Sequence, residues 1–251
     1  DVCSSDLYFM SRISFENYGR NTKEMGSKGS PTVIAGRYET QLEFERYIFF
    51  DVIDKLKIEH SDSVLDIGSG PGSIAIPLSF ICEKVTAIDH SYVLDGMRKR
   101  CGGLYNLFFQ NGNFLDIETN EKFNKIIVYS VLQYLEDEQE VMEFILKAIS
   151  MLHIGGAILL GDIPNVSKKA RFIESEFGKK FINEWGSVAH TGTDKLSFDS
   201  DDKTPVFNDS MILSIIEKVR FSGFHAYVLP QLTDLPFGHT REDILIVKPG
   251  K

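Results

Sequence analysis

Hydrophobic and polar residues follow two periodic patterns along this chain. Over 39–58 the apolar residues return every three or four positions, which predicts an amphipathic helix. Beyond it, short apolar runs of strand length alternate with longer stretches of helical spacing. Because parallel strands need helical crossovers, this alternation predicts an α/β fold, with an open sheet and helices on both of its faces.

The predicted strands and helices follow one another in a regular order. The last two strands are joined by the short segment 230–241, and a connection of this length joins antiparallel strands. The end of the sheet therefore differs from the parallel remainder. The predicted strands are 63–67, 85–88, 104–110, 125–129, 157–161, 226–229 and 243–248, and the predicted helices are 39–58, 73–82, 92–100, 138–152 and 210–221.

Three regions of the chain differ in composition. Residues 1–38 are polar and punctuated by glycine, which predicts an N-terminal arm, and 39–251 form the α/β domain. Within the domain, 162–208 is an insertion that starts helical and ends as a polar loop, and we expect a lid over the carboxyl ends of the strands. Asp1–Leu7 match the translation of a common sequencing adapter, so they are either an assembly artefact or a genuine polar segment.

Overall charge and cysteine content narrow the range of partners and cellular compartments that we expect. With 36 acidic and 27 basic residues the net charge is −9, which disfavours nucleic acid as a partner, since phosphate contacts need a basic surface. Three cysteines without a paired framework indicate a reducing compartment, and we expect a cytoplasmic protein. No apolar run is long enough to span a membrane, and no grouping of histidines and acids indicates a metal site. The oligomeric state does not follow from these features.

The most informative stretch is Val64–Gly72, where a predicted strand ends in a glycine-rich loop before a helix. Gly68, Gly70 and Gly72 allow a sharp turn and a close approach of the backbone to a ligand. The N–H groups that begin the next helix point toward the same place. A strand, glycine loop and helix in this order predict a site for a nucleotide-like cofactor.

The order of elements, the Asp66-x-Gly68-x-Gly70-x-Gly72 loop and the final antiparallel pair together resemble the class I S-adenosylmethionine-dependent methyltransferases. The resemblance covers roughly residues 40–250. It implies a Rossmann-like seven-stranded sheet in the order 3-2-1-4-5-7-6, with strand seven antiparallel. It also implies S-adenosylmethionine as cofactor and S-adenosylhomocysteine as product.

The resemblance assigns roles to residues around the loop. Asp89 corresponds to the acid that accepts hydrogen bonds from both ribose hydroxyls. Asn113 stands where the family has an acid facing the adenine amino group, a departure that keeps an acceptor oxygen and loses the charge. Phe114 would offer a backbone N–H to the ring, and Tyr129 a carbonyl to the methionine ammonium. The implied cofactor residues are Asp66, Gly68, Ser69, Gly70, Asp89, His90, Asn113, Phe114 and Tyr129.

Candidates for the chemistry lie in loops after the later strands, because ligands gather at the carboxyl ends of strands in α/β sheets. Asp162 is either an acid or base at the acceptor or the N-cap of the next helix. His239 is the preferred general base, because its ordinary pKa is about 6.5, and Asp162 would orient it or the acceptor. The predicted acceptor-binding residues are Tyr134, Asn165, Lys168, Arg171 and His190.

These residues predict methyl transfer to a small-molecule acceptor, with a hydroxyl of a sugar or phosphorylated metabolite as the expected target. A weak resemblance of 161–172 to methyltransferases found with surface-polysaccharide and nucleotide-sugar enzymes favours such an acceptor. N-methylation of a small molecule stays open, and so does catalysis by proximity alone, without a base.

Two other classes of function are weaker. Gly70, Gly72 and Ala75 satisfy the glycine fingerprint of NAD(P)-dependent oxidoreductases, but that interpretation leaves Asp66 and Gly68 without a role and finds no Tyr-x-x-x-Lys group for hydride transfer. A methyltransferase-like module that only binds a partner would carry a broken cofactor loop, whereas this loop is intact.

Overall fold

The computed structural model describes residues 18–19, 22–23, 30–35, 37, 41–189 and 205–250, and within α9 the side chains only up to 183. Some sequence-based hypotheses fall outside these ranges. They include the origin of Asp1–Leu7 and the role of His190, which both stay predictions.

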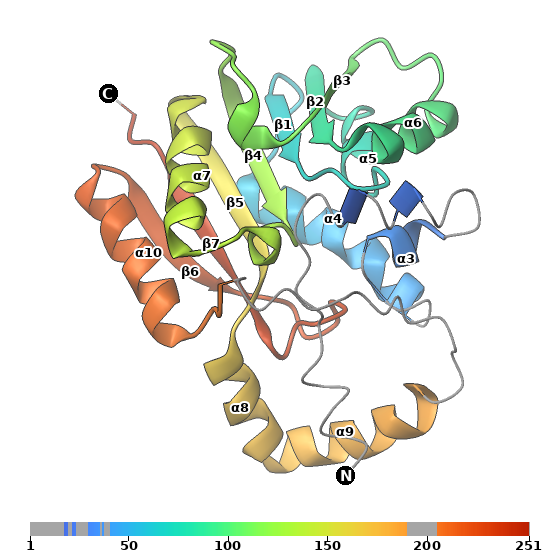
Figure 1. The fold of residues 1–251 in the computed structure, drawn as a ribbon, viewed down its shortest axis with the longest axis vertical. Coiled ribbons are helices and arrows are strands. Elements are labelled where there is room, and N and C mark those ends of the chain that lie inside the picture. Colours follow the sequence, from blue (N-terminus) through green and yellow to red (C-terminus); the bar gives the residue numbers. More distant parts are fainter. Residues whose placement is uncertain are drawn as a thin grey trace.

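Seven strands form one sheet in the order β3-β2-β1-β4-β5-β7-β6 (Figure 1). Strand β7 runs antiparallel to both of its neighbours, and the other pairs are parallel. The predicted Rossmann-like sheet with an antiparallel seventh strand is therefore confirmed. The strands are β1 Ser63–Ile67, β2 Lys84–Asp89, β3 Leu107–Asn111, β4 Phe123–Tyr129, β5 Leu152–Pro164, β6 His225–Pro230 and β7 Arg241–Val247.

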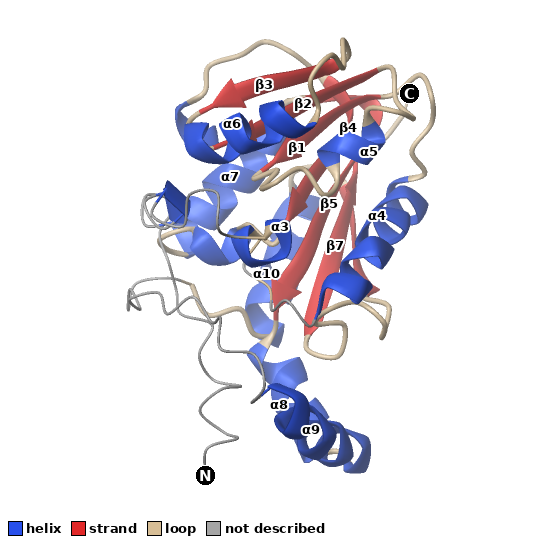
Figure 2. Cartoon of the chain, turned by 90° about the vertical axis from the view of Figure 1, so that its right-hand side faces the viewer, coloured by secondary structure: helices blue, strands red, loops and turns tan. Residues whose placement is uncertain are grey.

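Helices cover both faces of the sheet (Figure 2). The buried apolar residues divide into two clusters, one beneath α4, α5 and α6 and the other beneath α7 and α10. Alternate residues of β1 belong to opposite clusters, as the period of two in a strand requires. The helices are α3 Pro31–Ile34, α4 Leu42–Leu56, α5 Ala75–Leu78, α6 Ser91–Arg100, α7 Glu138–Ser150, α8 Val166–Glu174, α9 Glu176–Ala189 and α10 Asp209–Phe221, with 3-10 turns η3 Phe114–Asp116 and η4 Leu132–Tyr134.

Two elements differ most from the predictions. The helix expected over 73–82 shrinks to the single turn α5, which contains Pro77, a residue without a backbone N–H, and turns flank it on both sides. The strand expected over 157–161 is longer at both ends and runs from Leu152 to Pro164 as β5. The pairing of β5 with β7 shifts register between Leu160 and Ile163, and a bulge of this kind re-aims the side chains within it.

The insertion begins with the last residues of β5, where the sequence predicted a helical start, and the expected helices follow as α8 and α9. These two helices extend away from the sheet beyond the carboxyl end of β5 (Figures 1 and 2). The polar loop expected near 199–203 lies outside the described residues, and the role of the insertion as a lid stays a prediction.

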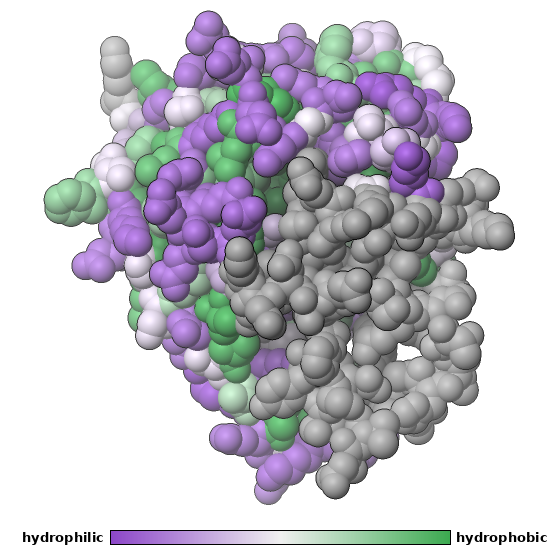
Figure 3. All heavy atoms as spheres, in the orientation of Figure 1, coloured by the Kyte–Doolittle hydropathy of each residue, from purple (hydrophilic) through white to green (hydrophobic). Residues whose placement is uncertain are grey.

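On the face drawn in Figure 3, hydrophilic side chains make up much of the described surface, with hydrophobic ones showing between them. Among the helices that the structure describes, none combines the length and apolar character that crossing a membrane requires.

Candidate functional site

A cavity of about 800 Å³ opens at the carboxyl ends of β1, β2 and β4. The chain reverses there into the glycine loop, the start of α6 and the segment after β4, so residues distant in sequence meet. All nine predicted cofactor residues line this cavity, together with Tyr134 from the predicted acceptor set. They are Asp66, Gly68, Ser69, Gly70, Asp89, His90, Asn113, Phe114 and Tyr129.

The glycine loop is shaped by left-handed backbone and by close packing. Gly68, Gly70 and Gly72 have φ of 71°, 54° and 89°, which side-chain-bearing residues rarely adopt. A Cβ at Gly68 would lie 2.4 Å from the Cγ2 atom of Val131. Glycine at position 68 therefore brings the loop directly against the segment that follows β4.

Asp89 ties the end of β2 to this loop. Its Oδ2 accepts from the Gly70 N–H at 2.7 Å, and its Oδ1 accepts from the His90 N–H at 2.6 Å. Burial raises the pKa of Asp89 to about 6, while these two backbone donors act in the opposite direction. The carboxylate thus helps to hold the loop in shape as well as facing the cavity.

Asp66 carries an unsatisfied oxygen at the base of the cavity. The residue is 1% exposed, and among the described residues its Oδ2 atom has no hydrogen-bond partner. Burial, and then the nearby charge of Asp89, raise the pKa of Asp66 to about 8. Because a buried acceptor without a partner is unfavourable, Asp66 is suited to a donor or cation brought by a ligand.

The remaining predicted cofactor residues have local contacts of their own. His90 is the N-cap residue of α6, and its ring stacks on Tyr92 at 5.2 Å between centroids. The Asn113 side chain accepts from the Leu115 N–H at 3.1 Å and so caps η3. The Phe114 ring packs on that of Phe144, 4.7 Å away. These contacts fix the cavity wall where the adenine is expected.

The N-terminal segment contributes residues that the sequence patterns did not single out. Tyr18, Ala35 and Arg37 line the cavity. The Tyr18 hydroxyl donates to the Ile34 carbonyl at 3.1 Å, and its ring lies 5.8 Å from that of Tyr134. Isolated polar residues in an irregular stretch carry no periodic signal, so the sequence offered only a polar arm.

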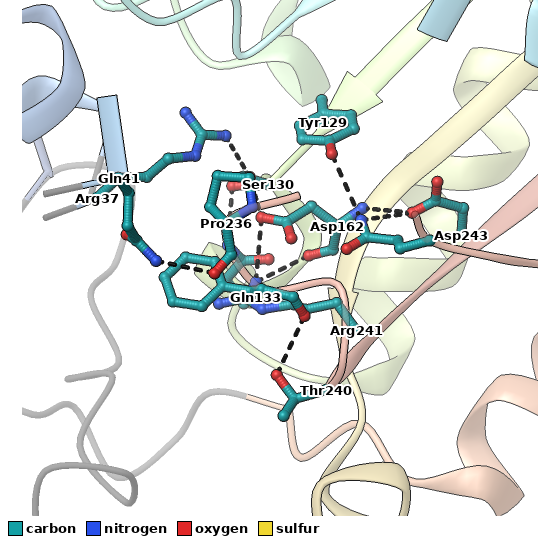
Figure 4. A network of polar contacts seen from close by, with 12 residues as sticks. Arg37, Gln41, Tyr129, Ser130, Gln133, Asp162, Pro236, Thr240, Arg241 and Asp243 are labelled. Carbon is teal, nitrogen blue, oxygen red and sulfur yellow. Dashed lines mark hydrogen bonds and ion pairs between the residues drawn. The ribbon is translucent and has the colours of Figure 1, made fainter. Parts of the chain in front are cut away.

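Arg37 joins this segment to the end of β4. Its Nη1 pairs with the Glu45 carboxylate at 2.9 Å, and its Nη2 donates to the Ser130 Oγ at 3.2 Å (Figure 4). Both side chains of the ion pair are almost fully buried. The guanidinium therefore faces the cavity in a fixed position.

Asp162 lies immediately behind Ser130. The Ser130 hydroxyl donates to Asp162 Oδ2, while Arg241 Nη1 donates to the Asp162 carbonyl at 2.8 Å and to its Oδ2 at 3.3 Å (Figure 4). The Asp162 N–H donates to Asp243 Oδ1 at 2.8 Å. Asp162 is 4% exposed, and of this hydrogen-bonded pair it is Ser130 that lines the cavity in the described part of the chain.

Asp243 connects this group of residues to α4. The Lys55 ammonium binds Asp243 Oδ2 at 2.7 Å, and Gln231 Nε2 donates to its Oδ1 at 2.9 Å. Gln231 Nε2 also lies 3.4 Å from the Tyr129 hydroxyl. Buried carboxylates and cations thus alternate, so each charge has a partner of opposite sign.

His239 does not reach the cavity within the described part of the chain. Its ring stacks on Phe172 at 4.7 Å, with an interplanar angle of 3°, and meets the edges of Phe177 and Phe181. Burial, and then the charge of Lys168, lower the pKa of His239. Because the aromatic side chains of α8 and α9 hold the imidazole, this position does not favour His239 as the general base.

Three predicted acceptor-binding residues are also engaged elsewhere. Asn165 caps α8, accepting from the N–H groups of Ser167 and Lys168 at 2.9 and 3.1 Å. The Lys168 ammonium donates to the Arg241 carbonyl at 2.5 Å, and Arg171 pairs with Asp209. These contacts give Asn165, Lys168 and Arg171 structural roles and do not favour the predicted binding of an acceptor. Among the residues that the structure describes, no group of histidines, cysteines and acids could hold a metal ion.

Residues 38–172, more than half of the chain, match the family model of nodulation protein S (NodS). The chain belongs to the NodS family. Nodulation protein S of Bradyrhizobium diazoefficiens is 28% identical over 100 residues, which cover 39% of this chain and 48% of that protein. An uncharacterized methyltransferase of Staphylococcus carnosus is 28% identical over 92 residues, covering 37% and 43%. The matched part is thus under half the length of both curated relatives.

Solved structures share the fold of this NodS family member. Phosphoethanolamine N-methyltransferase 1 of Haemonchus contortus has a TM-score of 0.66 at 16% identity, over 97% of this chain and 52% of that one. The N-methyltransferase NodS of Bradyrhizobium japonicum WM9 has a TM-score of 0.59 at 15% identity, over 93% and 99%. The predicted class I S-adenosylmethionine-dependent methyltransferase family and fold are confirmed.

Proposed function

We propose that this protein transfers a methyl group from S-adenosylmethionine to a small-molecule acceptor. The observation that carries the proposal is the buried oxygen of Asp66, which has no hydrogen-bond partner among the described residues and belongs to a side chain that lines the glycine-loop cavity beside Asp89. A cofactor with a cationic amino-acid end and a ribose would supply partners for these two carboxylates. The solved structures of the two N-methyltransferases named above were both obtained with S-adenosylhomocysteine, which supports the same cofactor here.

The residues present fit this cofactor. Asp66 would bind its cationic amino group, and Asp89 its ribose hydroxyls. Asn113 and the backbone of Phe114 would hold the adenine, while the Tyr129 carbonyl would face the amino-acid end. When bound, the cofactor supplies a methyl group on a sulfonium. The chain holds the acceptor in line with that group, and positioning of this kind is worth about 7–11 kcal/mol.

The acceptor is proposed to carry an amino or a hydroxyl group. The sequence favoured a hydroxyl of a sugar or phosphorylated metabolite, whereas the two N-methyltransferases among the solved neighbours favour an amine. Tyr134 lines the cavity and remains our candidate for acceptor contact. Transfer of label from S-adenosylmethionine labelled in its methyl group to fractionated amines or alcohols would distinguish the two classes.

Titration calorimetry with S-adenosylhomocysteine and with NAD tests the cofactor. We expect binding of S-adenosylhomocysteine, its loss in Asp66→Ala, and unchanged binding in Asp54→Ala, because Asp54 is an exposed acid on α4. Binding of NAD without binding of S-adenosylhomocysteine would refute the proposal.

A further inference from the structure

We propose that Ser130 and Asp162 together accept the proton that the acceptor loses, with Ser130 touching the acceptor and Asp162 positioned behind it. This inference rests on the proposed methyl transfer. It assigns Ser130 as a catalytic residue, gives Asp162 a role that does not require it to reach the cavity, and replaces His239 as the base.

The location of Ser130 is the first support. It follows Tyr129, the last residue of β4, and precedes Val131, whose side chain contacts the backbone at Gly68. Ser130 itself lines the cavity that contains Asp66 and the glycine loop. Ser130 is therefore placed beside the proposed cofactor site, where an acceptor would approach the transferred methyl group.

Backbone strain is the second support. Ser130 and Asp162 have φ of 60° and 59°, and among the described residues the only other non-glycine residue with positive φ is Lys57, at the C-cap of α4. Left-handed backbone is costly for residues other than glycine and recurs at functional sites, where surrounding structure maintains it. Here it turns two side chains on neighbouring strands toward each other.

Arg37 determines which lone pair and which proton of the Ser130 hydroxyl are already used in hydrogen bonds. A serine hydroxyl has one proton to donate and two lone pairs to accept with. The Arg37 Nη2 group donates to one lone pair at 3.2 Å, and the hydroxyl proton goes to Asp162 Oδ2. Within the part of the chain that the structure describes, the second lone pair of Ser130 Oγ is then available to a donor in the cavity, such as an ammonium or a hydroxyl.

The proton transfer balances without another reactant. If an acceptor atom bonded to the methyl carbon while the carbon–sulfur bond broke and left its electron pair on sulfur, the acceptor's proton would pass to Ser130 Oγ. The original Ser130 proton would pass to Asp162 Oδ2, which would become neutral. Arg241 Nη1 lies 3.3 Å from this same oxygen.

Sinefungin tests the placement without knowledge of the acceptor. In this analogue an amine-bearing carbon replaces the sulfur, so its ammonium stands where the transferred methyl would be. We expect the wild-type protein to bind sinefungin about tenfold to a hundredfold more tightly than S-adenosylhomocysteine, as for a charge-assisted hydrogen bond. Ser130→Ala and Asp162→Asn should each reduce this affinity ratio at least about fivefold.

The ratio of the sinefungin affinity to the S-adenosylhomocysteine affinity separates a local role of a side chain from a general loss of folding or of cofactor binding. Asp162→Asn keeps the side-chain shape, and asparagine tolerates left-handed backbone. Ser130→Gly provides a second variant without the hydroxyl if Ser130→Ala fails to fold. Ser222→Ala, at the C-cap of α10 and outside the residues that line the cavity, should leave the ratio unchanged.

An unchanged ratio in Ser130→Ala, or in Ser130→Gly where alanine does not fold, would overturn the inference, whatever happens to the absolute affinities. Failure of the wild-type protein to bind either compound would instead refute the proposed function. The two failures are therefore distinguishable in one set of titrations.

Discussion

Ser130 and Asp162 share a hydrogen bond and the same left-handed backbone conformation, one residue beyond the paired ends of neighbouring strands. Tyr129 of β4 is opposite Gly161 of β5, and each strand then turns with φ near 60°. The two turns bring the hydroxyl of Ser130, which lines the cavity, together with the carboxylate of Asp162 behind it. This geometry has consequences for stability that can be measured separately from binding.

The backbone at Ser130 predicts an unusual order of stabilities. We expect Ser130→Gly to be more stable than Ser130→Ala by about 1 kcal/mol, because left-handed backbone costs alanine about 1–2 kcal/mol and glycine almost nothing. Both variants lose the hydrogen bond to Asp162, so it cancels in the comparison. Urea unfolding measures the difference. At Ser214, inside α10, the order should reverse by about 1 kcal/mol, and the same order at both sites would contradict the strain argument.

Asp89 should matter more for cofactor affinity than for folding. We expect Asp89→Ala to weaken S-adenosylhomocysteine binding by about 2–4 kcal/mol, since it removes charge-assisted hydrogen bonds to the ribose and an anchor of the Gly70 N–H. Calorimetry gives the affinity, and circular dichroism shows whether the fold persists. An unchanged dissociation constant would place the ribose elsewhere.

Asp66 should make the ligand-free protein less stable as pH rises. Its pKa is about 8 in the folded chain, above the value of about 3.9 for an unfolded aspartate. Between these values the folded state holds a proton that the unfolded state has released, so the free energy of unfolding falls with increasing pH. One pKa unit corresponds to about 1.4 kcal/mol, and we expect a loss of about 1–4 kcal/mol by pH 7.

Asp66→Asn removes this titration and isolates its effect. Urea unfolding from pH 4 to pH 8 should show a smaller decline in stability for the variant than for the wild type, and greater stability of the variant at pH 7. Asp54→Asn, at an exposed position, should not flatten the curve in this way. Parallel curves for wild type and Asp66→Asn would mean that Asp66 is ionised in the ligand-free protein.

We expect the Asn165 side chain to stabilise the fold and not to bind a ligand. Its side chain caps α8 and donates to Asp209 at 2.8 Å and to Glu242 at 2.7 Å, although it is only 1% exposed. Asn165→Ala should therefore cost about 1–3 kcal/mol of stability through the lost cap and the buried groups left unpaired. Affinity for S-adenosylhomocysteine should stay unchanged. A loss of that affinity with normal stability would return Asn165 to the binding site.

The sequence by itself determined the sheet of this protein and the position of its glycine loop. Strand 63–67 was predicted with the bounds that β1 has, and the antiparallel end of the sheet followed from the shortness of one connection. The glycine loop could be recognised because it follows a strand end, and the role of Asp89 followed from the resemblance to the family. Each of these features is a buried face, a turn or a helix start. Such features depend on residues that are close together in the chain.

Only the tertiary structure decided which polar side chains meet. Arg37 and Ser130 are 93 residues apart, and Ser130 and Asp162 are 32 apart, so no local period reports their contact. Asn165 and His239 have residue types suited to binding or catalysis, but capping and aromatic stacking engage them first. A side chain's chemistry can be read from its type, whereas its partner depends on where the packed strands and helices place it.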